Sequence, residues 1–109
     1  ETVNMLGVHI IDIKDIPEIK SQKEQRFFID NFSKRELRYI ENSPNQKYTA
    51  AVLFSLKESI LKCDNSFIDI PFNKINITLK NPLALHPRFY LSYSTLNKKT
   101  IISTALVKI

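Results

Sequence analysis

The stretch YTAAVLFSLKESILK, residues 48–62, predicts the longest helix of this chain, an element on which a sheet can pack. Its apolar residues recur every three to four positions, as on one face of an α-helix, over about four turns. Asp64-Asn65 then supplies the turn chemistry that ends the helix. Three charged residues, Lys57, Glu58 and Lys62, interrupt the apolar run. Their place in so apolar a helix makes them the first candidates for chemistry.

The residues before this helix predict one strand and two short helices. NMLGVHIIDI, residues 4–13, is a short apolar run rich in β-branched residues and ends in charge, which is typical of a buried strand. From residue 14 to about 43 the chain is rich in charged residues, with apolar residues at intervals. This pattern indicates two short helices broken near Phe32. Ser33 followed by Glu36 matches a capping box and marks the start of the second helix.

The residues after the long helix predict three strands. KINITLK, residues 74–80, alternates between polar positions and an apolar face made of Ile75, Ile77 and Leu79. NPLALHPR, residues 81–88, contains two prolines and is predicted to be a loop. FYLSYSTL and TIISTALVKI, joined by NKK, predict a β-hairpin. We therefore expect an α+β fold, a largely antiparallel sheet packed on a long helix, in one domain over residues 1–109.

Composition excludes several classes of protein. A chain of 109 residues with 43% hydrophobic and 25% charged residues fits one small globular domain. No apolar run approaches the ~18 residues of a membrane span, and the N-terminus lacks the pattern of a signal peptide. Cys63 is the only cysteine, so no intrachain disulfide forms, which suits a reducing compartment and predicts a cytoplasmic protein. Gly7 is the only glycine, which excludes a glycine-rich phosphate loop.

The net charge of +5 favours acidic partners and is unevenly distributed. Residues 57–109 carry eight basic and three acidic residues, whereas residues 14–47 carry eight and six. Phosphates, nucleic acid or an acidic protein would all suit such a surface, and solubility alone would also explain it. Nucleic acid is the weakest of these predictions, because the chain has no zinc-ligand spacing, no helix-turn-helix pattern and no aromatic ribonucleoprotein motif.

Four segments taken in order resemble one enzyme family. They are LGVHIIDIKDI (6–16), NFSKREL (31–37), FSLKESILK (54–62) and LSYSTLNKKTIISTALV (91–107). Together they resemble the phosphopantetheinyl transferase superfamily, in particular the short holo-acyl-carrier-protein synthase type, over nearly the whole chain. The Lys-Glu-Ser at 57–59 with Lys62 is the most specific part, and order and spacing carry the rest. The resemblance implies the fold of a single transferase half.

The resemblance also implies a reaction. In that family coenzyme A is the substrate, and its 4′-phosphopantetheine arm passes to a serine hydroxyl of an apo acyl carrier protein in fatty-acid or polyketide synthesis. Adenosine 3′,5′-bisphosphate is released, and a divalent metal, Mg²⁺ or Mn²⁺, neutralises the pyrophosphate. By the resemblance Glu58 is a catalytic metal ligand and Lys57 a catalytic residue that also holds coenzyme A phosphates. The other implied coenzyme A contacts are Lys62, Ser92 and Ser94.

The metal ligands implied by the resemblance are His9, Asp12 and Glu58. Aligned on GVHIIDIKDI, the family's first metal-binding aspartate falls at His9 and its next acidic residue at Asp12. A neutral imidazole is a poor ligand for Mg²⁺ and suits Mn²⁺ or Zn²⁺ better. A shifted register would give Asp12 the first role, at the cost of an insertion and of Gly7. Residues 9 and 12 point to opposite faces of a regular strand, so both reach one metal only if the strand ends or bulges between them.

Each candidate also has a purely structural interpretation. Glu58 and Lys62 are four residues apart and could form an ordinary helix ion pair worth a few tenths of a kcal/mol. His9 could be a hydrogen-bonded histidine on a buried strand. Cys63 is predicted to be a small packed residue and not a nucleophile, because no obvious base accompanies it.

Four further positions depart from the family pattern. CDNSF, residues 63–67, replaces a glycine-rich turn that receives a coenzyme A phosphate. Leu53 replaces an arginine, Thr95 a histidine, and Asp15 a basic residue that faces the carrier protein in the family. The main alternative is therefore a catalytically impaired homologue that binds a carrier protein or synthase component without transfer. A basic nucleic-acid-binding module is the third hypothesis.

The resemblance implies an oligomer as well. The short synthases assemble as homotrimers with active sites between subunits, and a chain of this length has room for one half of a site. We therefore expect a homotrimer, held by apolar strand faces such as Phe89, Leu91 and Ile101.

Overall fold

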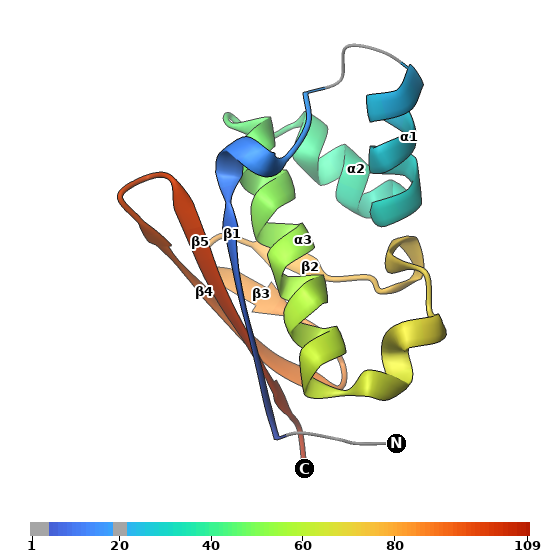
Figure 1. Cartoon of the computed structure of the whole chain (residues 1–109), viewed down its shortest axis with the longest axis vertical. Helices are drawn as coiled ribbons and strands as arrows, with labels where there is room; N and C mark the ends of the chain where they lie inside the picture. Colours follow the sequence, from blue (N-terminus) through green and yellow to red (C-terminus); the bar gives the residue numbers. More distant parts are fainter. Residues whose placement is uncertain (1–4, 19–21) are drawn as a thin grey trace.

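The structure, a computed structural model, describes residues 5–18 and 22–109, and Figure 1 shows its α-helices on one side of a single sheet. The sheet has the strand order β1-β5-β4-β3-β2, and every pair in it is antiparallel. The α+β fold with a largely antiparallel sheet is therefore confirmed. The strands are β1 (Leu6–Asp12), β2 (Thr78–Lys80), β3 (Leu83–Leu85), β4 (Phe89–Leu96) and β5 (Thr100–Val107). The helices are α1 (Gln22–Asn31), α2 (Lys34–Glu41) and α3 (Gln46–Cys63), with short 3-10 turns η1 (Ile13–Asp15), η2 (Asn65–Asp69) and η3 (Phe72–Lys74).

The helices form where local sequence predicts them. The capping box is present: the Ser33 side chain accepts from the Glu36 amide at 3.2 Å, and the Glu36 carboxylate accepts from the Ser33 amide at 2.8 Å. The side chain of Asn45 accepts from the Tyr48 amide at 3.1 Å and starts α3 two residues earlier than predicted. The predicted break near Phe32 separates α1 from α2.

The segment between α3 and β4 differs from the prediction. Residues 74–80 were expected to form one strand, but η3 precedes it and β2 begins only at Thr78. Residues 81–88 were expected to be a loop, but they contain β3, which pairs with β2. Strand β3 has three residues, of which only Ala84 is buried. So short and exposed a strand has too little apolar pattern for the sequence to reveal it.

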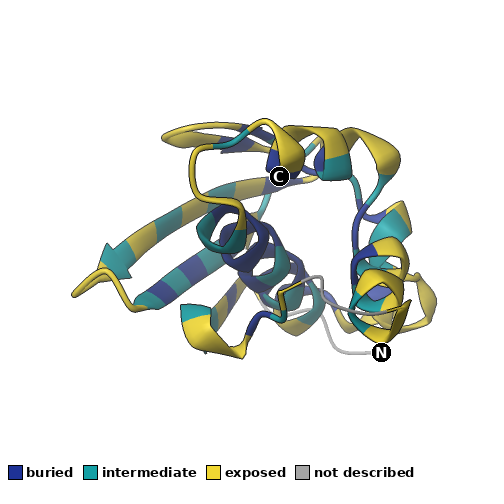
Figure 2. Cartoon of the chain, turned by 90° about the horizontal axis from the view of Figure 1, so that it is seen from above, coloured by how far each residue is buried: buried dark blue, intermediate teal, exposed yellow. Residues whose placement is uncertain are grey.

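Helix α3 lies at the centre of the hydrophobic core and is buried along most of its length (Figure 2). Apolar residues of α3 pack against α1, α2 and the inner face of the sheet. The helix also buries hydroxyls against β5, where the Oγ of Ser103 lies 2.7 Å from that of Ser55 and 2.6 Å from that of Ser59. Small hydroxyl residues let helix and strand approach closely while their polar atoms stay hydrogen-bonded.

Gly7 explains how closely β1 approaches α3. A Cβ atom at this position would lie 2.0 Å from the backbone oxygen of Ser59 and 2.6 Å from the backbone nitrogen of Cys63. Only a residue without a side chain permits this contact between two backbones. Gly7 therefore fixes the distance from β1 to the C-terminal half of α3, two residues before His9.

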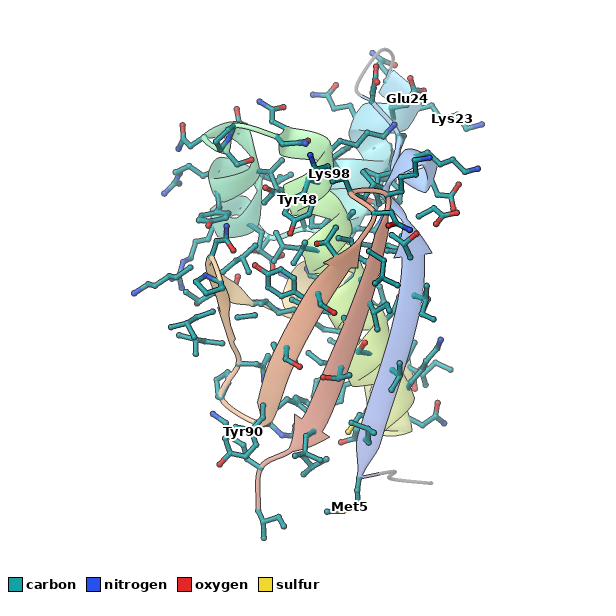
Figure 3. The ribbon with its side chains drawn as sticks, turned by 90° about the vertical axis from the view of Figure 1, so that its left-hand side faces the viewer. Met5, Lys23, Glu24, Tyr48, Tyr90 and Lys98 are labelled. Atoms are coloured by element: carbon teal, nitrogen blue, oxygen red, sulfur yellow. The ribbon has the colours of Figure 1, made fainter. Side chains whose placement is uncertain are left out.

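The two faces of the sheet differ, because alternate residues of β1, β4 and β5 point to opposite sides. Phe89 and Ile101 are 2% and 0% exposed on the face that packs against α3. The prediction that these residues hold a trimer is therefore wrong, and Leu91 lies beside them, packed against the same core. The opposite face, seen in Figure 3, carries exposed apolar side chains, among them Leu6, Val8, Ile10, Tyr90 and Leu106.

Within the described residues, 5–18 and 22–109, no helix is both long enough and apolar enough to cross a bilayer.

Candidate active site

Three of the predicted site residues meet where β1 passes α3. The ammonium nitrogen of Lys62 lies 2.9 Å from Nδ1 of His9, and Oε2 of Glu58 lies 4.0 Å from the same ring atom. Glu58 and Lys62 stand one turn apart on α3, and His9 points toward them from the middle of β1. We call these three residues the His9 cluster. The side chains of His9 and Glu58 are 19% and 26% exposed, so the cluster is open to a ligand.

The contact with Lys62 defines the state of His9. A lysine ammonium has only donors, so Nδ1 of His9 accepts and the ring proton belongs on Nε2. Partial burial lowers the pKa of His9 from its usual value of 6.5, and the nearby Lys62 ammonium lowers it further, while Glu58 opposes them. The accepted hydrogen bond and the lowered pKa both favour the neutral ring.

Lys57 lies elsewhere and does not belong to the His9 cluster. Its side chain is 0% exposed, and its ammonium donates to the Asn31 carbonyl at 2.8 Å, the Phe72 carbonyl at 2.7 Å and Oε1 of Glu36 at 2.5 Å. Burial lowers the pKa of Lys57, and the Glu36 carboxylate opposes that effect. An ammonium with three protein acceptors and no exposed surface cannot reach a bound phosphate. The prediction of a catalytic, phosphate-holding Lys57 is therefore wrong.

Asp12 does not complete a metal site with His9 and Glu58. Strand β1 pairs with β5 in continuous register from Leu6 to Asp12, so it neither ends nor bulges between positions 9 and 12. Oδ1 of Asp12 instead accepts a hydrogen bond from the Thr100 hydroxyl at 2.9 Å. Residues 9 and 12 do share an open hollow of about 470 Å³ at this end of the strand, which Phe27 and Phe54 also line.

The two predicted serines lie on the other face of the sheet. Ser92 and Ser94 alternate with the inward-facing residues of β4 and are exposed. The Ser92 hydroxyl lies 2.6 Å from that of Thr104 on β5. Within one chain the sheet therefore separates both serines from the His9 cluster.

The residues present do not fit a magnesium ion. A hard divalent cation prefers several oxygen ligands, and the His9 cluster offers one carboxylate and one ring nitrogen that already accepts from Lys62. Among residues 5–18 and 22–109, no group of three or more His, Cys, Asp or Glu side chains is placed to hold a metal ion. The chemistry of this donor set therefore gives Mg²⁺ no second carboxylate.

Sequence reasoning missed one residue that organises this region, Glu36. It is 2% exposed, and its Oε2 accepts from the Ile77 amide at 2.8 Å while Oε1 binds Lys57 and the Ser33 amide. Its place in the capping box concealed this second role, since the local motif already explains a glutamate there. By contrast, Cys63 is buried as predicted, and burial raises the pKa of its thiol, which disfavours the thiolate that a nucleophile needs.

Comparison with known proteins agrees with this architecture. The family model described as 4′-phosphopantetheinyl transferase superfamily matches residues 5–104. No curated protein matches the chain.

Solved structures with the same fold include bacterial holo-[acyl-carrier-protein] synthases. The enzyme of Neisseria meningitidis superposes with a TM-score of 0.75 at 18% identity and covers 99% of this chain and 100% of its own. That of Thermotoga maritima gives 0.74 at 14% identity, with 98% of this chain but 64% of the other chain covered. The Helicobacter pylori synthase, solved in complex with coenzyme A, gives 0.70 at 19% identity over 95% and 100%. The family match over residues 5–104 shows that this chain belongs to the 4′-phosphopantetheinyl transferase superfamily.

Proposed function

We propose that this chain transfers the 4′-phosphopantetheine arm of coenzyme A to a serine of an apo acyl carrier protein. The observation that carries the proposal is the His9 cluster, in which an exposed lysine and a carboxylate both lie near Nδ1 of His9 in a chain of this family. The coenzyme A complex of the Helicobacter pylori relative supports the choice of substrate. The serine oxygen would form a bond to the phosphorus next to the pantetheine arm. The bond from that phosphorus to the leaving adenosine 3′,5′-bisphosphate would break.

Two residues of the cluster have roles that suit this transfer. The Lys62 ammonium would bind the pyrophosphate oxygens and stabilise the charge that develops on them as the bond breaks. Glu58, one turn before it, would orient Lys62 and lies where it could also accept the proton of the attacking serine.

The family's reaction uses a divalent metal ion, for which the His9 cluster offers only two side chains. If Mg²⁺ or Mn²⁺ binds, Glu58 and His9 are the side chains that would hold it, and it would supply charge neutralisation to the pyrophosphate. One carboxylate and one imidazole suit Mn²⁺ or Zn²⁺ better than Mg²⁺. Asp12 would join them only if the end of β1 rearranged, because its carboxylate bonds to Thr100.

A homotrimer would complete the site. The apolar face that remains uncovered is the outer face of β1, β5 and β4, where Leu6, Ile10 and Tyr90 are 53%, 60% and 61% exposed. Three adjoining strands with such residues form a patch that favours a second copy of the chain. Ser92 and Ser94 lie on this same face, so they could reach coenzyme A only on a neighbouring subunit. Light scattering that finds a strict monomer at micromolar concentration would contradict this assembly.

One experiment separates transfer from its alternative. The chain is incubated with coenzyme A and apo acyl carrier proteins, with and without Mg²⁺ or Mn²⁺, and the intact mass of each carrier protein is measured. The proposal predicts a mass gain equal to one phosphopantetheine group. A catalytically impaired homologue would bind the carrier protein or coenzyme A and leave the mass unchanged. Neither mass gain nor coenzyme A binding under any condition would remove the proposed function.

A further inference from the structure

Lys62 contacts the His9 ring nitrogen that faces Glu58. Its ammonium lies 2.9 Å from Nδ1 of His9, the same atom that faces Glu58 at 4.0 Å. We propose that the Lys62 ammonium, which contacts His9, is a built-in cation that receives the pyrophosphate of coenzyme A, so that this chain binds its substrate without a divalent metal ion. This inference rests on the proposed function and specifies how its site obtains positive charge.

Competition for one lone pair is the first argument. A metal bound by His9 and Glu58 would need the Nδ1 lone pair of His9, which faces both groups. That lone pair accepts the hydrogen bond from Lys62, so the ion and the ammonium exclude each other. Displacing Lys62 would leave its charge near the incoming ion, because the side chain extends from α3 one turn after Glu58.

Charge balance is the second argument. The cluster brings one carboxylate, Glu58, and one ammonium, Lys62, to the ring of His9, whose Nδ1 accepts from Lys62. A divalent ion would bring two positive charges to a single carboxylate and lie within a few ångströms of an ammonium, which opposes binding.

Two acidic residues outside the cluster, Asp12 and Asp64, already have hydrogen-bond partners. Asp12 accepts from Thr100, and Oδ1 of Asp64 accepts from the Ser66 amide at 3.0 Å and hydroxyl at 2.6 Å. Oδ2 of Asp64 lies 3.7 Å from the Arg88 guanidinium.

The position of Lys62 on α3 is the third argument. It stands in the last turn of the helix, where the partial negative charge of the backbone carbonyls favours a cation. The residue is exposed, and its ammonium also contacts Nδ1 of His9. Lys57, five residues earlier, is fully enclosed and cannot serve in this way. Of the two lysines, Lys62 is the exposed one.

The first experiment measures metal binding to the protein without coenzyme A. Mn²⁺ is titrated into the natural chain and into His9→Asp, and free Mn²⁺ is followed by its electron paramagnetic resonance signal. We expect no binding at submillimolar Mn²⁺ in the natural chain and clear binding in His9→Asp, which supplies a second carboxylate beside Glu58. Submillimolar Mn²⁺ binding by the natural chain, or none by a folded His9→Asp, overturns the inference. Thermal melts establish that the variant is folded.

The second experiment measures coenzyme A binding by calorimetry in EDTA and in millimolar Mg²⁺. We expect the natural chain to bind equally in both, and Lys62→Met to lose about tenfold or more in affinity, equivalent to about 1.4 kcal/mol. Lys98→Met is the matched control, because Lys98 lies at the hairpin tip, at the opposite end of the sheet from the end of α3 (Figures 1 and 3), and should bind normally. His9→Asp should bind coenzyme A more tightly in Mg²⁺ than in EDTA.

The outcomes distinguish this inference from the proposed function. If the natural chain binds coenzyme A in Mg²⁺ but loses about tenfold or more of its affinity in EDTA, the built-in cation is wrong and the transferase proposal stands. Equal loss in Lys62→Met and Lys98→Met would also overturn it, since a general charge effect would then suffice. If coenzyme A binds under no condition, the proposed function is wrong, and the proposed role of Lys62 is wrong as well.

Discussion

Two lysines of α3, only five residues apart, have opposite environments. Lys57 is 0% exposed and donates to three oxygens from α1, α2 and η3, whereas Lys62 is exposed and contacts the imidazole of His9 on β1. The two directions from the helix axis differ because residues advance about 100° each. A lysine that faces other helices becomes a structural cation, and one that faces a strand at the open edge of the sheet can serve a ligand. The same residue type therefore has two different roles, because the fold places different neighbours around each lysine.

The largest loss of stability should follow from replacing the buried lysine, Lys57. Lys57→Met leaves the Glu36 carboxylate buried without its partner, so we expect the free energy of unfolding to fall by about 3–5 kcal/mol in urea denaturation. Lys62→Met is the matched control and should cost less than about 1 kcal/mol, because its ammonium is exposed. The double variant Lys57→Met with Glu36→Gln should recover part of the loss. Equal costs for the two lysine variants would show that burial does not distinguish them.

The next effect tests the contact that assembles the open cluster. Gly7→Ala places a Cβ 2.0 Å from the Ser59 backbone oxygen, and backbone cannot move aside as a flexible side chain does. We expect a loss of about 1–3 kcal/mol from overpacking. Because β1 must shift away from α3, affinity for coenzyme A should fall as well, measured by calorimetry under conditions where the variant remains folded. Lys98→Met, at the hairpin tip, is the control and should leave the affinity unchanged.

The third effect concerns function with little change in stability. Glu58→Ala removes the carboxylate of the His9 cluster and should weaken coenzyme A binding or transfer by about tenfold or more, or about 1.4 kcal/mol. Its stability should change by only a few tenths of a kcal/mol, as for an exposed helix ion pair. Glu41→Ala, at the exposed end of α2, should change neither property. Unchanged coenzyme A binding and transfer in Glu58→Ala would return this residue to a purely structural role.

The smallest expected effect concerns the pH dependence of stability and contrasts His86 with His9. His86 packs on Phe67 and Phe89, and its Nδ1 accepts from the Arg88 amide at 3.0 Å, so its contacts belong to the fold and not to the His9 cluster. Burial lowers the pKa of His86 below 6.5, and Arg88 and Lys108 lower it further.

A histidine whose pKa is lower in the folded chain than in the unfolded chain stabilises the fold while it is neutral. The unfolded chain therefore binds more protons as pH falls below about 6.5, and the contribution of His86 to stability is lost in that direction. We expect the difference in unfolding free energy between about pH 7 and about pH 5.5 to be smaller in His86→Asn than in the natural chain. An unchanged difference would show that His86 does not titrate with folding.

Local patterns were sufficient for most of the elements. The long helix was predicted over residues 48–62 and spans Gln46–Cys63, and the hairpin strands begin at Phe89 and Thr100 as predicted. Each of these elements depends on hydrogen bonds and apolar spacing within a few residues, so the sequence around it contains the cause. The candidates Glu58, Lys62 and His9 also came from the sequence, through spacing and a family resemblance.

The tertiary structure alone decided what those residues contact. Lys57 was assigned to a ligand because nothing near it in sequence indicates that Glu36, 21 residues away, would neutralise it inside the core. Lys62 and His9 are 53 residues apart, and their contact depends on Gly7, whose missing side chain lets β1 approach α3. The open face of the sheet was equally hidden, since alternation gives two faces and does not say which one the helices cover. Burial and partnership are properties of the assembled chain, because they arise from segments that meet only after folding.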